Sequence, residues 1–183
     1  ALCGKNRLEL VLFYLSAIQI GARVLMLNPM FPLEKRIALC QAYHADFFFT
    51  SDQAECATEQ RKCGQIFKCF FTFSDAIQQA EKIDAFGDFP VNLTQPATMT
   101  LTSGSTGLPK AVVHNVQAHL DNAQGVCDLM QFGATDSWLL SLPLYHVSGQ
   151  GIVWRWLTTG ATLVLPGEDF YGAVNQVTHV SLV

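Results

Sequence analysis

Short runs of consecutive apolar residues alternate along this chain with segments of helical periodicity, and that alternation limits the possible folds more than any other feature. Residues 22–27 and 47–50 are apolar at most positions, as expected of strands that are buried on both faces. Residues 8–18 and 33–43 repeat apolar side chains every three or four positions, which predicts helices. The sequence therefore predicts an α/β domain in which helices cover both faces of a largely parallel sheet.

Residues with strong positional preferences predict where several elements begin and end. Asn6 followed by Glu9 resembles a capping box for the first helix, which Gly21 would end. Asn115 is expected to cap a later helix, and Gly160 to end another. Further strands are predicted at 69–73, 97–101, 138–140 and 161–165, further helices at 51–61, from 74 onward and at 149–157, and a connection at 84–96.

A loop rich in glycine and hydroxyl groups follows the strand predicted at residues 97–101. Glycines let backbone N–H groups approach an anion, hydroxyls donate hydrogen bonds and a lysine adds positive charge, which together suit an oligophosphate. The spacing is not that of a Walker loop, because Gly107 is followed by Leu-Pro-Lys. The alternative interpretation is an ordinary surface turn. The residues of the loop are Thr102, Ser103, Gly104, Ser105, Thr106, Gly107, Leu108, Pro109 and Lys110.

The same loop resembles the phosphate-binding signature of the adenylate-forming superfamily, which includes acyl- and aryl-CoA synthetases, luciferases and the adenylation domains of peptide synthetases. Residues Leu142-Pro143-Leu144-Tyr145-His146 are similar to the superfamily's Pro-Leu-aromatic-His segment beside the acyl pocket. Residues 138–157 resemble the bacterial o-succinylbenzoate:CoA ligases of menaquinone synthesis. The resemblance implies that residues 1–183 are the interior of the large N-terminal domain, without the C-terminal lid domain.

The chemistry implied by the resemblance is an ATP-dependent ligation of an aromatic carboxylic acid, o-succinylbenzoate, to coenzyme A. The loop would bind the phosphates of ATP, Thr106 would lie beside Mg²⁺, and Lys110 and His146 would contribute to catalysis. His146 would border the acyl pocket and the coenzyme A tunnel, or be a hydrogen-bonded structural histidine. Two interpretations, lining of the acid pocket or the start of a helix, are open for Ser148, Gly149, Gln150 and Gly151. A structural role is expected for His44, His114, His119 and His179.

Two other functions remain open at this point: another acyl-CoA synthetase or amino-acid adenylation domain, or a nucleotide-binding module without catalysis. Residues 1–4 resemble the tail of an apolar strand without its start, and residues 179–183 resemble a strand with no turn after it, so we expect a piece of a longer protein. The superfamily's glutamate ligand for Mg²⁺, ribose motif, hinge and C-terminal lysine have no match here, so the piece alone is expected to be inactive. A sheet edge left unpaired would favour self-association into homo-oligomers.

The composition narrows the partners and the location. The chain has 183 residues, 50% of them hydrophobic, and its net charge of −4 argues against nucleic acid as a partner. Polar residues interrupt the apolar stretches, so no membrane span is expected. Six cysteines without a C-x-x-C pair are expected to be reduced thiols in the cytoplasm, not metal ligands or disulfides. The phenylalanines at 47–49 and 70–73 are expected to be core, not an aromatic cofactor box.

Overall fold

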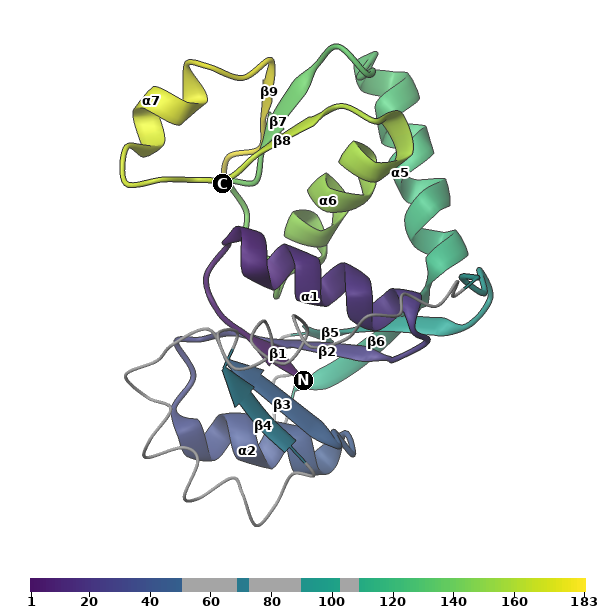
Figure 1. Ribbon diagram of the computed structural model, residues 1–183, viewed down its shortest axis with the longest axis vertical. Helices are drawn as coiled ribbons and strands as arrows, with labels where there is room; N and C mark the ends of the chain where they lie inside the picture. Colours follow the sequence, from purple (N-terminus) through teal and green to yellow (C-terminus); the bar gives the residue numbers. More distant parts are fainter. Residues whose placement is uncertain (51–68, 73–89, 103–108) are drawn as a thin grey trace, which may run out of the picture.

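The computed structural model describes residues 1–50, 69–72, 90–102 and 109–183, with only the backbone for 69–72. In these ranges strands and helices alternate, and the predicted α/β class is confirmed (Figure 1). The strands are β1 (Leu2–Cys3), β2 (Val24–Leu27), β3 (Phe47–Thr50), β4 (Cys69–Thr72), β5 (Pro96–Thr102), β6 (Lys110–Asn115), β7 (Ser137–Leu139), β8 (Thr162–Val164) and β9 (His179–Val180). The helices are α1 (Leu8–Gln19), α2 (Leu33–Ala42), α5 (Val116–Met130), α6 (Val147–Thr159) and α7 (Phe170–Val174).

The strands form two sheets. The larger has the order β4-β3-β1-β2-β5-β6, and all neighbours are parallel except β6, which is antiparallel to β5. The smaller has the order β8-β7-β9 and is parallel throughout. The prediction of a largely parallel arrangement is therefore confirmed, whereas the division into two sheets was not predicted. The helices predicted at 51–61 and from residue 74 lie outside the described ranges.

The central strands of the larger sheet are buried on both faces, which explains why β2 and β3 are apolar at consecutive positions. In β2, Val24 and Met26 pack in one cluster with α1, α5 and α6, whereas the alternate residues pack in a second cluster with α2. Phe49 and Phe48 of β3 divide between the two clusters in the same way. The predicted burial is wrong for Phe47, the first residue of β3, which is 55% exposed and lines a cavity beside the end of α1.

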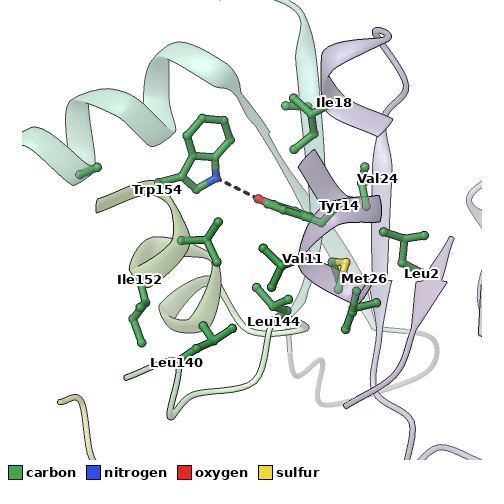
Figure 2. Close-up of a cluster of buried hydrophobic side chains, with 14 of the residues drawn as sticks. Leu2, Val11, Tyr14, Ile18, Val24, Met26, Leu140, Leu144, Ile152 and Trp154 are labelled. Atoms are coloured by element: carbon green, nitrogen blue, oxygen red, sulfur yellow. Dashed lines mark hydrogen bonds between the residues drawn. The ribbon is translucent and has the colours of Figure 1, made fainter. Parts of the chain in front are cut away.

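Helix α1 lies between the larger sheet and α6 (Figure 1). Figure 2 shows three of its side chains, Val11, Tyr14 and Ile18, between strand residues on one side and residues of the 140–154 region on the other. The indole N–H of Trp154 donates a hydrogen bond of 2.9 Å to the hydroxyl of Tyr14, which is fully buried. One core therefore joins the first helix to a helix that begins more than a hundred residues later.

The residues predicted to cap or end helices do so except at the start of α1. Asn115 caps α5, because its side-chain oxygen accepts a hydrogen bond of 2.8 Å from the N–H three residues later. Gly21 and Gly160 have φ angles of 82° and 67°, a conformation that favours glycine. The predicted capping box is wrong, since the N-cap of α1 is Arg7 and has no side-chain cap. The Asn6 side chain bonds instead to the backbone of Leu140, Leu142 and Leu144.

Three of the six cysteines, Cys3, Cys40 and Cys127, are buried in the core, as expected of cysteines that serve as small apolar residues. Cys56 and Cys63 lie outside the described ranges, and only the backbone of Cys69 is described. In the part of the chain that the structure describes, no helix combines the length and the apolar character that a membrane crossing requires.

Candidate functional site

The predicted phosphate loop connects β5 to β6. Thr102 ends β5 at the carboxyl edge of the parallel strands, and Lys110 begins β6 directly opposite it. The Thr102 hydroxyl donates a hydrogen bond of 3.1 Å to the Lys110 carbonyl, and both residues are exposed. Phosphate binding itself stays a prediction, because the central residues lie outside the described ranges: Ser103, Gly104, Ser105, Thr106, Gly107 and Leu108.

The second arm of this hairpin is attached to α2. Tyr43, just after the last residue of that helix, donates a hydrogen bond of 2.5 Å from its hydroxyl to the carbonyl of Pro109. Pro109 has no N–H to offer to a neighbouring strand, and β6 begins at the next residue. The exposed side chain of Lys110 therefore extends from a backbone that is held on two sides, by β5 and by Tyr43.

Threonines on one side of β5 connect this strand to α5 and α6. Thr98 and Thr100 are buried, and the alternation of a strand places Thr102 on the same side. The Thr98 hydroxyl lies 2.8 Å from Nε2 of His119 on α5. The Thr100 hydroxyl lies 3.3 Å from Nε2 and 3.4 Å from Oε1 of Gln150 on α6. The strand that leads into the predicted phosphate loop therefore runs beside the start of α6.

A turn between β7 and α6 carries His146. The chain leaves the smaller sheet after Leu139, and the Pro143 carbonyl then accepts a hydrogen bond of 3.0 Å from the N–H of His146. His146 is the exposed N-cap residue of α6, and its ring lies 4.7 Å from that of Tyr145. Ligands of open α/β sheets bind beyond the carboxyl ends of parallel strands, which is where this histidine lies. Its part in binding or catalysis stays a prediction.

Two carboxamide side chains hold the backbone of this turn. Nδ2 of Asn6 donates to the carbonyls of Leu140 and Leu142, at 3.0 and 2.7 Å. Oδ1 of Asn6 accepts a hydrogen bond of 3.1 Å from the N–H of Leu144. Gln150 is fully buried, and its Nε2 donates to the carbonyl of Leu144 at 3.0 Å. The turn before His146 is thus fixed by Asn6, which precedes α1, and by Gln150 of α6.

The helix-start interpretation of residues 148–151 is confirmed, since all four lie in the first two turns of α6. Ser148 is exposed, whereas Gly149, Gln150 and Gly151 are buried. A Cβ at Gly149 would overlap the carbonyl of Pro143, so the missing side chain lets the helix approach the turn closely. That these residues line an acid pocket stays a prediction.

A buried pair of stacked rings lies behind the site. His119 is 6% exposed and stacks on Trp154, with ring centroids 5.0 Å apart and planes 4° from parallel. Burial, with a smaller contribution from the nearby charge of His114, lowers the pKa of His119 to about 4. Burial also raises the pKa of Tyr14, the partner of Trp154. Both groups are therefore neutral near pH 7, which agrees with the structural role expected for His119.

Metal binding has one candidate residue from the sequence, Thr106, which the structure does not describe. Among the residues that it does describe, no three His, Cys, Asp or Glu side chains gather where they could hold a metal ion.

A parallel α/β sheet with a glycine-rich loop after one of its strands is typical of nucleotide-binding proteins. This chain belongs to the AMP-binding enzyme family, whose model matches residues 1–183. The 2-succinylbenzoate–CoA ligase of Haemophilus influenzae is 52% identical over 183 residues, which are all of this chain and 35% of that protein. The enzyme of the same name from Escherichia coli is 42% identical over 179 residues, 97% of this chain and 36% of that protein.

Solved structures agree with this assignment. Wild-type E. coli MenE with a bound analogue of OSB-AMS is 36% identical, with a TM-score of 0.75 over 99% of this chain and 37% of that one. The o-succinylbenzoate coenzyme A synthetase (MenE) of Bacillus subtilis in complex with AMP gives a TM-score of 0.85 at 23% identity, over 99% and 48% of the two chains. The second likeness supports the fold alone. The chain spans about a third of the length of the curated relatives named above.

Sequence reasoning missed three residues that organise the site, namely Asn6, Thr98 and Thr100, and one core residue behind it, Tyr14. The threonines carried a signal, because polar side chains at alternate positions of a buried strand must find hydrogen-bond partners. Asn6 carried a misleading one, since an asparagine just before a helix is usually its N-cap. No signal in the sequence pairs Tyr14 with Trp154.

Proposed function

We propose that the protein to which these residues belong is an ATP-dependent ligase that activates o-succinylbenzoate and transfers it to coenzyme A, a reaction of menaquinone biosynthesis. The 52% identity to the H. influenzae 2-succinylbenzoate–CoA ligase carries this proposal, because it extends over the whole chain and therefore over both predicted motifs. The enzyme of the same name from E. coli supports the same substrate.

The arrangement of the two motifs suits an adenylation. The reaction joins the carboxylate of the acid to the α-phosphate of ATP and releases pyrophosphate, so acid and nucleotide must be held side by side. The contact between Thr100 and Gln150 supports this, since it joins the strand before the phosphate loop to the helix after His146. An acid near His146 and phosphates near Thr102 would then approach each other from neighbouring elements.

The described ends of the loop fit an oligophosphate. Thr102 offers a hydroxyl and Lys110 an ammonium group, both exposed at the carboxyl edge of the sheet. In the proposal, the loop from Thr102 to Lys110 binds the β- and γ-phosphates, and Thr106 lies beside Mg²⁺. When bound, the ion would neutralise part of the phosphate charge. A threonine hydroxyl is suited to this ion, because Mg²⁺ prefers hard oxygen ligands.

The protein's contribution is to position the reactants and to stabilise charge. Lys110 places its positive charge near the pyrophosphate that leaves. His146 borders the acid and the thiol of coenzyme A, which attacks the acyl carbon and expels AMP. Ser148, Gly149, Gln150 and Gly151 remain candidates for the lining of the acid pocket. We place these residues in the N-terminal nucleotide- and acyl-binding domain of a cytoplasmic enzyme, and self-association through the edge strands β4 or β6 remains a prediction.

The test uses the full-length protein that contains this chain. Pyrophosphate exchange is measured with o-succinylbenzoate, with a fatty acid and with an amino acid as the carboxylate. We expect exchange with o-succinylbenzoate to be at least about tenfold faster than with the other two acids. A wrong acid leaves polar groups of the site without hydrogen-bond partners, and this lowers the rate by that factor or more. A preference for a fatty or an amino acid would contradict the proposed substrate.

Two substitutions test the site residues. Lys110→Ala removes a charge-assisted contact and should raise the KM for ATP about tenfold to hundredfold. His146→Ala should lower the rate of thioester formation more than that of pyrophosphate exchange. Lys35→Ala, which removes a lysine that lies over Phe31 near the start of α2, is the control and should leave both rates unchanged. Wild-type kinetics in both site variants would remove Lys110 and His146 from the mechanism, whereas a full-length wild type without exchange for any of the acids would favour a module without catalysis.

A further inference from the structure

We propose that Asn6 is a positioning residue of the acid-binding side of the site: its carboxamide fixes the backbone from Leu140 to Leu144, and through that backbone it fixes His146. The role of Asn6 in catalysis rests on the proposed function. The role of Asn6 in fixing the turn rests on the structure alone.

Asn6 uses both ends of its carboxamide on the same segment. Its Nδ2 lies 3.0 Å from the carbonyl oxygen of Leu140 and 2.7 Å from that of Leu142, and its Oδ1 lies 3.1 Å from the nitrogen of Leu144. These partners are 134 to 138 residues away in sequence. Two donors and an acceptor in one rigid planar group define the spacing of three backbone groups at once.

The segment needs such a partner because it leaves the sheet inside the core. Leu140 still pairs through its N–H with the carbonyl of Val164, but its carbonyl and that of Leu142 bond to Asn6. The side chains of Leu140 and Leu144 are almost completely buried, and the residues between them are half-buried. A backbone group that packing shields from water needs a partner, and the Asn6 side chain supplies one at three partly buried points.

The link from Asn6 to His146 is short. Leu144, whose N–H bonds to Asn6, is two residues before His146, and its carbonyl accepts from Gln150. The N–H of His146 bonds in turn to the carbonyl of Pro143. Glycine at position 149 allows the first turn of α6 to approach that carbonyl. A change at Asn6 therefore displaces the backbone that sets the direction of the His146 side chain.

Asn6 is also free for this task, because it does not cap α1. The N-cap of that helix is Arg7, and no side chain bonds to its first N–H groups there. An asparagine that served the helix would bond to an N–H two or three residues later, whereas all three of its side-chain bonds reach the turn.

The functional test measures separate KM values for o-succinylbenzoate and ATP in the full-length protein with Asn6→Ala and Asn6→Asp. We expect the KM for the acid to rise at least tenfold in Asn6→Ala, with the KM for ATP within twofold of wild type. Asn6→Asp should be the more damaged variant, because a carboxylate keeps the size but places negative charge against two carbonyl oxygens. An Asn6→Asp enzyme with wild-type kinetics would overturn the proposal.

Tyr14→Phe is the matched control, since it also removes a buried hydrogen bond between α1 and the second half of the chain. It should lower stability while it leaves the KM for the acid unchanged. A protein that is only partly folded loses active enzyme, so its apparent kcat falls and both KM values stay constant. If Asn6→Ala shows that same pattern, Asn6 has a merely structural role and the proposal fails.

A second measurement separates this inference from the proposed function. Hydrogen exchange at the N–H of Leu144 should be at least tenfold faster in Asn6→Ala than in wild type, whereas the amides of α1 keep their protection. Unchanged exchange at Leu144 would overturn the inference. If the wild type shows no activity with o-succinylbenzoate, the proposed function fails, and faster exchange at Leu144 would still support the fixing of the turn by Asn6.

Discussion

Acidification should destabilise this protein through one buried histidine, His119. Its ring is 6% exposed, is stacked on Trp154 and lies 2.8 Å from the hydroxyl of Thr98. The His114 ring lies 5.4 Å away, so a proton on His119 gains no compensating negative charge from that neighbour. Burial, followed by the effect of His114, lowers the pKa of His119 to about 4, against an ordinary value of 6.5.

The sign of the effect follows from where the proton binds. Because the folded protein has the lower pKa, the unfolded chain takes up the proton first as the pH falls from 6.5 to 4. The contribution of neutral His119 to stability is therefore complete above pH 6.5 and is lost progressively down to pH 4. Each pH unit in this window costs about 1.4 kcal/mol, so the loss between pH 7 and pH 5 is about 2 kcal/mol.

The assay is urea unfolding of the full-length protein at pH 7 and pH 5, in the wild type and in His119→Gln. Glutamine can still bond to Thr98 but does not titrate, so the free energy of unfolding should fall about 2 kcal/mol less on acidification than in the wild type. The absolute stability of the variant is not informative, because the stacking on Trp154 is lost. His146→Gln, which removes an exposed histidine, is the control. Equal losses in wild type and His119→Gln would refute the reasoning.

Three further substitutions test the contacts around the site, each by urea unfolding. Tyr14→Phe leaves the buried N–H of Trp154 without an acceptor and should cost about 1–3 kcal/mol; a loss below about 0.5 kcal/mol would contradict the burial of that bond. Gly149→Ala places a methyl group against the backbone of Pro143. The overpacking should lower the free energy of unfolding by about 1–3 kcal/mol, which exceeds the gain of up to about 1 kcal/mol from the higher helix propensity of alanine. A variant more stable than the wild type would show that the turn can move to accept the methyl group. Asn115→Ala removes the cap of α5 and should cost about 1 kcal/mol, whereas Asn115→Ser should retain most of it.

Local structure was largely predictable because its causes are local. A buried parallel strand is apolar at consecutive positions, so β2 and β3 were recognisable, and helical spacing indicated α1 and α5. Asn115 caps α5 through its own neighbours, and Gly160 ends α6 through its own φ angle. The position of His146 beyond the end of a strand was predictable for the same reason.

The sequence could not predict which distant groups these elements meet. Antiparallel β6, the separate sheet β8-β7-β9 and the exposure of Phe47 depend on how the elements pack, which periodicity does not specify. The partners of Thr98 and Gln150 were hidden for the same reason, because a polar residue shows that it needs a partner but not which one.

Asn6 shows this division most clearly. By itself, the sequence determined that a carboxamide stands just before the first helix and that a phosphate-type loop and a histidine-bearing turn follow in order. Only the tertiary structure decided that this carboxamide bonds to the backbone of the turn more than 130 residues later and not to its own helix. The physical reason is that an amide side chain satisfies whichever backbone groups the packed core leaves without partners, and those groups are defined only once α1 lies against the turn.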